Sequence, residues 1–227
     1  MRIAVPVTNE LSEEVLVEAY LTALDAVVAA GFSDELDWQE QCRLDRLTEP
    51  KFLREAAWVI LSSGMRERVI HDRFPRISSA FLDWVGARQI LRRRAECARA
   101  ALRVFRHPGK IDAILAVAES IQRRSFEAIH SALMDHGIEA IDALPYIGPV
   151  TRFHLAKNLG LDVVKPDRHL VRLALSAGFT DPDRLCRIIS SATGDRIGTV
   201  DLVFWRFATL NSSYTALFDH DEGQKRC

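Results

Sequence analysis

The sequence predicts an all-α protein, and two observations carry that prediction. Apolar residues recur at three- and four-residue spacing from Leu11 to Leu210, which is the period of helices with one buried face. Continuous β-branched runs bounded by turns are nearly absent. The 227 residues, 48% hydrophobic and 27% charged, suffice for one large or two small domains and exclude a disordered chain or a fibre.

About a dozen short helices are expected, most of them ended by a glycine or a proline. The first, over 11–30, buries Leu16, Tyr20 and Leu24 and stops before Gly31, a typical residue just past a helix end. Pro75 is expected to fall at such an end as well. The other helices are expected over residues 34–46, 49–63, 66–73, 76–86, 88–106, 110–121, 123–135, 149–159, 167–177, 182–192 and 198–210.

Targeting and metal-binding patterns are weak. No apolar run approaches the roughly 18–20 residues of a membrane span, and the first residues lack the apolar stretch of a signal peptide. We therefore expect a cytoplasmic protein without membrane association. The four cysteines lie far apart with no C-x-x-C, which predicts free thiols rather than a zinc site or an iron–sulfur cluster. The polar tail, 219–227, is expected to be disordered.

Charge is divided unevenly along the chain. Residues 1–50 hold 3 Lys/Arg against 11 Asp/Glu, whereas residues 51–227 hold 27 against 20. The densest cluster is 88–110, with eight Lys/Arg against Glu96 alone. On a single helix, the side chains of Arg88, Arg92, Arg99, Arg103 and Arg106 share an arc of about 60°. Such a stripe is the footprint of a polyanion partner, or simply a solvated face.

A turn of chemical interest spans Leu144-Pro-Tyr-Ile-Gly-Pro-Val-Thr151. Gly148 permits either a positive φ or the close approach of another molecule, and Pro149 suits the first position of a helix. The free amides at that helix start form a ready site for a phosphate oxygen. The alternative is an ordinary connection between two helices.

An aspartate follows at the start of another expected helix. Pro166 keeps Lys165 out of the helical region, so the helix begins near Asp167. The Asp167 carboxylate is placed to cap that helix, to face a ligand, or both. An ionised carboxylate beside a sugar can stabilise an oxocarbenium-like transition state or orient a water molecule.

Together, the turn and the aspartate resemble the helix-hairpin-helix DNA glycosylase superfamily. Its L-P-G-[IV]-G-x-[KTW]-T-A hairpin precedes, by about twenty residues, an aspartate in D-x-H-x-x-R. Here Gly148 and Asp167 are 19 positions apart, and residues 167–172 reproduce D-x-H-x-x-R in full. Residues 58–63 (W-V-I-L-S-S) resemble the family's L-L-S helix, and 200–205 (V-D-L-V-F-W) its closing helix. The resemblance covers roughly 50–210 and is nearest to endonuclease III and 3-methyladenine DNA glycosylase-like members.

The resemblance implies a two-lobed, all-helical enzyme with its active site in the interlobe cleft. One lobe would combine 1–50 with 161–218, and the other would span 51–160 and end in the hairpin. Such an enzyme grips one strand of double-stranded DNA, flips a damaged or modified base out of the duplex and cuts its N-glycosidic bond. We expect it to act as a monomer.

The resemblance also assigns roles to residues of this chain. Asp167 would be the catalytic residue, and Met65 or a neighbour in its turn would fill the stack vacated by the flipped base. The expected DNA contacts are Tyr146, Gly148, Val150, Thr151, Ser63, Met65, Arg92, Arg99 and Arg103. Trp58, Lys165, His169 and Trp205 are expected to line or support the pocket, although both tryptophans fit a core role equally well.

Three departures from the family pattern refine the expectation. Tyr146 replaces the first hairpin glycine, which puts the usual backbone path in question. Val150 stands where bifunctional members carry a Schiff-base lysine, which predicts a monofunctional glycosylase that uses water. The cysteine loop is missing, so no iron–sulfur cluster, redox cofactor or catalytic metal is expected, although carbonyls around 147–150 could hold a monovalent cation.

Two alternatives remain open at this point. A non-catalytic helix-hairpin-helix protein would use Asp167 only as a cap, and a glycosylase/lyase would use Lys165. The excised base is equally open among alkylated, oxidised, deaminated and phage-hypermodified bases, with a slight lean towards alkylated ones.

Overall fold

The computed structural model describes residues 10–142 and 144–219, which contain twelve α-helices, four short 3-10 helices and no strand. The all-α prediction is therefore confirmed for the described residues. The chain forms two compact units: Met1–Gln41 with Asp162–Cys227 (unit 1), and Cys42–Leu161 (unit 2). Of the tail expected over 219–227, only Asp219 lies within the described residues.

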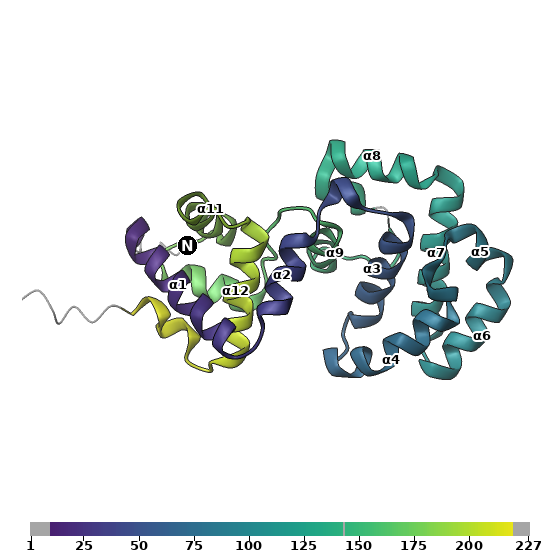
Figure 1. Ribbon diagram of the computed structural model, residues 1–227, viewed down its shortest axis with the longest axis horizontal. Coiled ribbons are helices and arrows are strands. Elements are labelled where there is room, and N and C mark those ends of the chain that lie inside the picture. Colours follow the sequence, from purple (N-terminus) through teal and green to yellow (C-terminus); the bar gives the residue numbers. More distant parts are fainter. Residues whose placement is uncertain (1–9, 143, 220–227) are drawn as a thin grey trace, which may run out of the picture. The chain divides into compact units, whose positions relative to one another are not determined.

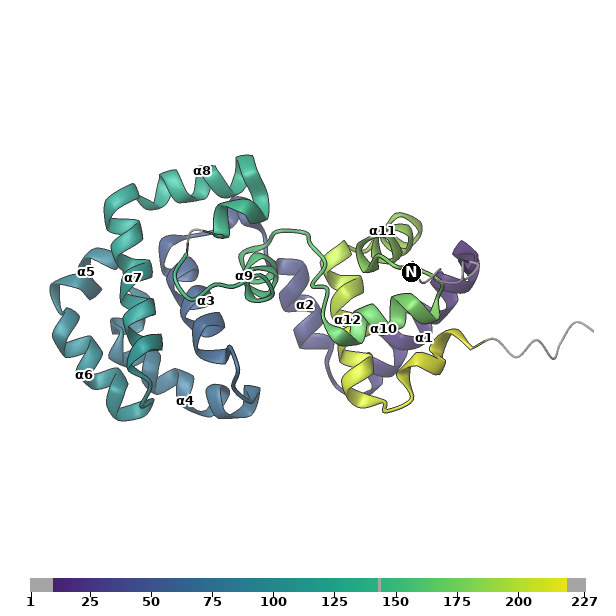
Figure 2. The ribbon, with the colours of Figure 1, turned by 180° about the vertical axis from the view of Figure 1, so that it is seen from behind.

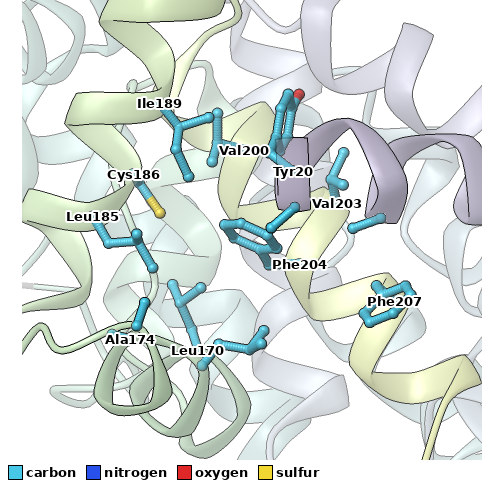
Figure 3. Packing of buried hydrophobic residues seen from close by; sticks show 14 of the residues in the cluster. Tyr20, Leu170, Ala174, Leu185, Cys186, Ile189, Val200, Val203, Phe204 and Phe207 are labelled. Carbon is cyan, nitrogen blue, oxygen red and sulfur yellow. The ribbon is translucent and has the colours of Figure 1, made fainter. Parts of the chain in front are cut away.

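Unit 1 is built around one apolar helix. Figure 3 shows Val200 and Phe204 of that helix, α12, between Tyr20 on one side and Leu185 and Ile189 on the other. The ring of Tyr20 meets that of Phe204 edge-on, with centroids 5.9 Å apart. The elements of unit 1 are α1 (Glu13–Ala29), α2 (Ser33–Gln41), α10 (Arg168–Ser176), α11 (Pro182–Thr193), α12 (Ile197–Leu210) and η4 (Tyr214–Phe218).

Unit 2 is organised around α7 (Pro108–Arg124), which contacts α3 on one side and α5 and α6 on the other (Figures 1 and 2). Nine residues of α7 are buried, because apolar side chains occupy more than one of its faces. The other elements of unit 2 are η1 (Leu44–Arg46), α3 (Glu49–Ser62), α4 (Glu67–Ala80), η2 (Leu82–Trp84), α5 (Ala87–Arg92), α6 (Arg94–Val104), α8 (Phe126–His136), η3 (Gly137–Ile141) and α9 (Thr151–Leu159).

Along the chain, the first boundary between unit 1 and unit 2 falls before Cys42, whereas the sequence predicted it between residues 50 and 51. Three local contacts tie the intervening segment to unit 2. Thr48 caps α3 by accepting the Lys51 N–H at 3.4 Å, and the His130 ring nitrogen Nε2 lies 2.8 Å from the Leu44 carbonyl oxygen. A Cβ built on Gly160 would lie 2.5 Å from the Leu44 nitrogen, so α9 ends directly against this segment.

Pro75 does not end a helix, which contradicts the two helices expected over 66–73 and 76–86. Instead α4 runs through it from Glu67 to Ala80. Ile70, Phe74 and Ile77 are all buried on one face of α4, while Pro75 is exposed. The apolar stripe therefore outweighs the hydrogen bond that proline cannot donate.

The two units carry opposite net charge. Unit 2 holds 20 Lys/Arg against 13 Asp/Glu, a net of +7, whereas the remaining residues hold 10 against 18, a net of −8. Because residues 162–227 are balanced, the acidic excess of unit 1 comes from its N-terminal segment. Any attraction for a polyanion is accordingly expected at unit 2.

Candidate functional site

The turn over residues 144–151, called the hairpin turn below, contains a non-glycine residue in a backbone conformation that is typical of glycine. Tyr146 has φ +63°, in the left-handed region that a bulky side chain rarely adopts. Gly148, by contrast, is not among the residues with positive φ. Tyr146 therefore adopts the type of conformation that a glycine would take there, at a cost on the order of 1 kcal/mol.

Thr151 closes the turn through its side chain. Its hydroxyl Oγ1 accepts the Gly148 N–H at 2.7 Å and lies 3.2 Å from the Gly148 carbonyl oxygen, which also accepts the Arg152 N–H at 3.0 Å. The Gly148 amide is thus hydrogen-bonded inside the turn in this conformation. The amides of Val150 and Thr151 donate to no described residue, and they remain the candidates at this end of α9.

The outer surface of the turn is open. The side chains of Tyr146 and Val150 are 50% and 58% exposed. A Cβ on Gly148 would meet only the Thr151 hydroxyl, at 3.9 Å, so another molecule can approach this backbone closely. Arg152 fastens the base of the turn with both Asp142 carboxylate oxygens, at 2.9 and 3.1 Å from Nη1.

A second exposed turn of unit 2 follows α3. Ser63 ends that helix, Gly64 has φ +68°, and the Met65 N–H donates to the Ser62 carbonyl at 3.0 Å. The Met65 side chain is 39% exposed. An exposed, flexible apolar side chain at the tip of a turn has the chemistry expected of a stack-filling residue.

The start of α7 links this turn to the hairpin. Lys110 is buried, and its Nζ donates to the Leu61 carbonyl at 2.7 Å and to that of Ser63. One residue earlier, a Cβ on Gly109 would lie 2.9 Å from the Tyr146 hydroxyl. The two turns expected to touch DNA therefore belong to one local assembly in unit 2.

Burial changes the role of Lys110. It was counted in the basic cluster over 88–110, but its side chain faces inward, and removal from water lowers its pKa below the ordinary lysine value. Lys110 therefore adds no charge to an exposed basic surface. Neither its position nor its partners could be read from the arginine-rich pattern.

The arginines of the predicted stripe are exposed, but they do not lie on one continuous helix. The single helix expected over 88–106 is interrupted at Arg93 (φ −112°, ψ +25°), which places Arg92 on α5 and both Arg99 and Arg103 on α6. No proline or glycine marks the break. All three of these arginines are exposed without an acidic partner among the described residues, whereas Arg94 pairs with Glu119.

In unit 1, Asp167 caps α10. Its Oδ1 accepts the N–H groups of His169 at 2.8 Å and Leu170 at 3.1 Å. Its Oδ2 accepts no hydrogen bond from the described residues, and the side chain is half-buried. One oxygen of the carboxylate is therefore structural, and the other is available to a ligand.

The loop before Asp167 is fixed from α12. The buried carboxylate of Asp201 accepts the Lys165 N–H at 3.2 Å, and the Asp167 N–H donates to the Lys165 carbonyl at 2.7 Å across Pro166. The Lys165 ammonium itself bonds to no described residue. Asp201 was missed as a site residue, although a lone acid inside the apolar run V-D-L-V-F signals a buried carboxylate with a partner.

His169 packs against Tyr214. Its ring meets that of Tyr214 at 65°, with centroids 5.3 Å apart, and its Nε2 accepts from the Arg168 guanidinium at 3.3 Å. The Nδ1 of His169 and the hydroxyl of Tyr214 are both buried without a partner in the described chain. Tyr214, on η4, was not expected here.

The two tryptophans make packing contacts within their own units. The Trp58 ring meets Phe74 edge-on, with centroids 5.0 Å apart. The Trp205 ring lies 4.7 Å from the Arg206 guanidinium, which pairs with Glu35 at 2.8 Å. Both side chains are half-buried, so each contributes to the core and still presents a surface.

The sequence-predicted residues thus form two local groups. The hairpin and the Met65 turn belong to unit 2, and Lys165, Asp167 and His169 belong to unit 1. Gly109 and Lys110 were missed, because their importance comes from contacts with residues more than thirty positions away.

Comparison with known proteins adds no relative. No family model, curated protein or solved structure matches this chain. Within the described residues, no group of three or more His, Cys, Asp or Glu could hold a metal ion. In the same part of the chain, no single helix is long and apolar enough to cross a membrane, and α1 with α2 would pass only as a pair bent by 113°.

Proposed function

We propose that this chain is a monofunctional DNA N-glycosylase, a hydrolase that extrudes a modified base from double-stranded DNA and cuts its N-glycosidic bond. The observation that carries the proposal is the divided role of Asp167. Its Oδ1 holds the start of α10, while Oδ2 has no partner among the described residues. A carboxylate oriented by its own helix costs little reorganisation when charge develops beside it.

The reaction assigned to Asp167 balances without a cofactor. The bond between C1′ and the base nitrogen breaks, its electron pair leaves with the base, and the sugar acquires oxocarbenium character that the Asp167 carboxylate stabilises. A water molecule adds its oxygen to C1′. One of its protons passes to the carboxylate and then to solvent, and the departing base takes up a proton from water.

DNA affinity is assigned to unit 2. The free amides of Val150 and Thr151 offer a sequence-independent grip on a phosphate, and the net charge of +7 over 42–161 favours a polyanion. Arg92, Arg99 and Arg103 would add phosphate contacts from α5 and α6. The role of Tyr146 is to place its exposed ring against the nucleic acid.

The deciding experiment is mass spectrometry of free bases released from alkylated, oxidised, deaminated and phage-modified DNA. Wild type should release at least one base, and Asp167→Asn should slow that release on the order of 10²–10⁴-fold. The matched control is Asp181→Asn, because Asp181 caps α11 in the same way, with Oδ1 accepting the Asp183 N–H at 3.0 Å. That control should release bases at the wild-type rate.

Other outcomes of the same experiment would replace the proposal. DNA binding without release of any base, unchanged by Asp167→Asn, would favour a non-catalytic module in which Asp167 is only a cap. Release accompanied by a borohydride-trapped protein–DNA adduct that disappears in Lys165→Ala would indicate a glycosylase/lyase instead.

The arginines have a separate test in the salt dependence of duplex binding. Arg99→Ala with Arg103→Ala should reduce the slope of log K against log salt by about 2, since each phosphate contact contributes about 0.9. The control pair is Arg123→Ala with Arg124→Ala, two exposed arginines at the far end of α7 from Lys110. An equal effect of both pairs would mean that the α6 arginines form a solvated face.

A further inference from the structure

Lys110 is a buried cation that the proposed function does not use. It is 4% exposed, and it forms no ion pair with a described residue. Its two partners are backbone carbonyls, those of Leu61 and Ser63. A buried ammonium is costly unless it is fully hydrogen-bonded, and an apolar residue would fill the same space at lower cost. What the ammonium provides is a fixed position for the end of α3.

These two carbonyls belong to the end of α3, where the exposed Met65 turn begins. Carbonyls at a helix C-terminus lack partners within the helix and carry its negative dipole end, so a cation suits them. With Ser63 held in place, Gly64 turns the chain through its positive φ, and the Met65 N–H returns to Ser62. Residues 109 and 110 therefore contact both exposed turns, through the Tyr146 hydroxyl and the Ser63 carbonyl.

We propose that Lys110 is a positioning residue that holds the Ser63–Met65 turn in the shape in which Met65 enters the DNA base stack. The inference rests on the proposed function, since it concerns how the vacated stack is filled. Base extrusion costs a few kcal/mol, and a side chain that replaces the base recovers part of that cost only if it is ordered beforehand. The Lys110 hydrogen bonds supply that order from inside unit 2.

The test uses the full chain and a duplex that contains one stable abasic-site analogue opposite 2-aminopurine, whose fluorescence rises when it is unstacked. Lys110→Gln should reduce the protein-dependent rise roughly tenfold while duplex affinity stays within about threefold, because the hairpin and arginines still hold the phosphates. Lys110→Arg, which can donate to both carbonyls, should restore most of the signal. A loss of affinity and signal together in Lys110→Gln, or no loss of signal, would overturn the inference.

A double-mutant cycle distinguishes positioning from general support of the fold. Met65→Ala alters only an exposed side chain and should lose the same signal, and adding Lys110→Gln to it should change the signal by less than about twofold. Additive effects would overturn the inference, as would a normal signal in Met65→Ala. If Lys110→Gln does not fold, Gly64→Ala replaces it as the test. Alanine at φ +68° strains the backbone of the turn without a steric clash, because nothing lies within 4 Å of its Cβ. A normal fluorescence rise in Gly64→Ala would also overturn the inference.

The readout is independent of base release. A Met65-dependent and Lys110-dependent signal in a protein that releases no base would refute the glycosylase and leave the stack-filling turn intact. Base release by the wild type, together with a fluorescence rise that is unchanged in Lys110→Gln, would support the glycosylase and refute the positioning role of Lys110.

Discussion

The hydroxyl of Tyr146 stands against the one residue of α7 that has no side chain: a Cβ on Gly109 would lie 2.9 Å from it. The Tyr146 ring also meets that of His107 nearly perpendicularly, with centroids 6.5 Å apart. The orientation of an exposed aromatic ring is thus set by the start of a neighbouring helix.

Gly109→Ala should separate stability from DNA affinity. Alanine is the better helix former, so the free energy of unfolding should be unchanged or higher by about 0.5–1 kcal/mol, while the new methyl displaces the Tyr146 hydroxyl. Gly109→Ala should lower duplex affinity when it is made in the wild-type chain, but not when it is made in a chain that already carries Tyr146→Ala. An equal fall in both backgrounds would show that Gly109 acts without Tyr146. Urea unfolding and fluorescence anisotropy measure the two quantities.

Tyr146→Gly and Tyr146→Ala should differ, although both remove the ring. Only glycine relieves the backbone at φ +63°, so the glycine variant should be more stable than the alanine variant by about 1 kcal/mol. Both should bind duplex DNA more weakly than wild type. Thermal unfolding compares the pair directly, and equal stabilities would mean that the turn relaxes out of the left-handed region.

The cap of α10 predicts a graded series at Asp167. Asparagine retains an oxygen that can accept from the His169 and Leu170 amides, so Asp167→Asn should keep most of the stability, whereas Asp167→Ala should lose about 1 kcal/mol. Asp181→Ala, at the equivalent cap of α11, should lose a similar amount. A loss of several kcal/mol in Asp167→Asn would mean that its activity defect reports unfolding rather than chemistry.

Gly160→Ala should be severely destabilising. The position has φ +97°, and its Cβ would lie 2.5 and 2.6 Å from the backbone of Leu44 and Arg43, which cannot move aside cheaply. Strain and overpacking together should cost about 3 kcal/mol. Gly31→Ala, at φ +87° with nothing within 4 Å, should cost only about 1 kcal/mol. Similar losses of stability in the two variants would mean that the positive φ, and not the close contact with residues 43 and 44, causes the destabilisation.

Tyr20 makes stability fall in alkali. Burial, reinforced by a 2.6 Å hydrogen bond to Asp195, raises the Tyr20 pKa well above its ordinary value of 10. The folded chain therefore keeps a proton that the unfolded chain releases, so the contribution of Tyr20 is complete below pH 10 and declines as the pH rises further. Tyr20→Phe should cost about 1 kcal/mol at neutral pH, and this difference should shrink above pH 10 in urea titrations. A constant difference would contradict the assignment.

Much of the fold was predictable because it depends on local pattern. Helical periodicity reported the apolar stripes that become buried, and Gly31 ends a helix where expected. The exceptions are instructive. Pro75 lies inside α4 because three buried apolar residues, Ile70, Phe74 and Ile77, anchor that helix. Arg93 interrupts a helix without any proline or glycine. In α4, packing outweighed the local preference of proline.

The candidate site was predictable in its residues but not in their partners. Apolar periodicity and composition predicted that the chain is helical, that its net positive charge lies after the first fifty residues, and that a helix begins at Asp167. Three features are visible only in the tertiary structure: Tyr146 takes a glycine-like conformation, the Gly148 N–H donates to the Thr151 hydroxyl, and Lys110 faces inward. The physical reason is that periodicity and capping act within a few residues, whereas a buried ammonium or a strained turn is fixed by atoms supplied from distant segments.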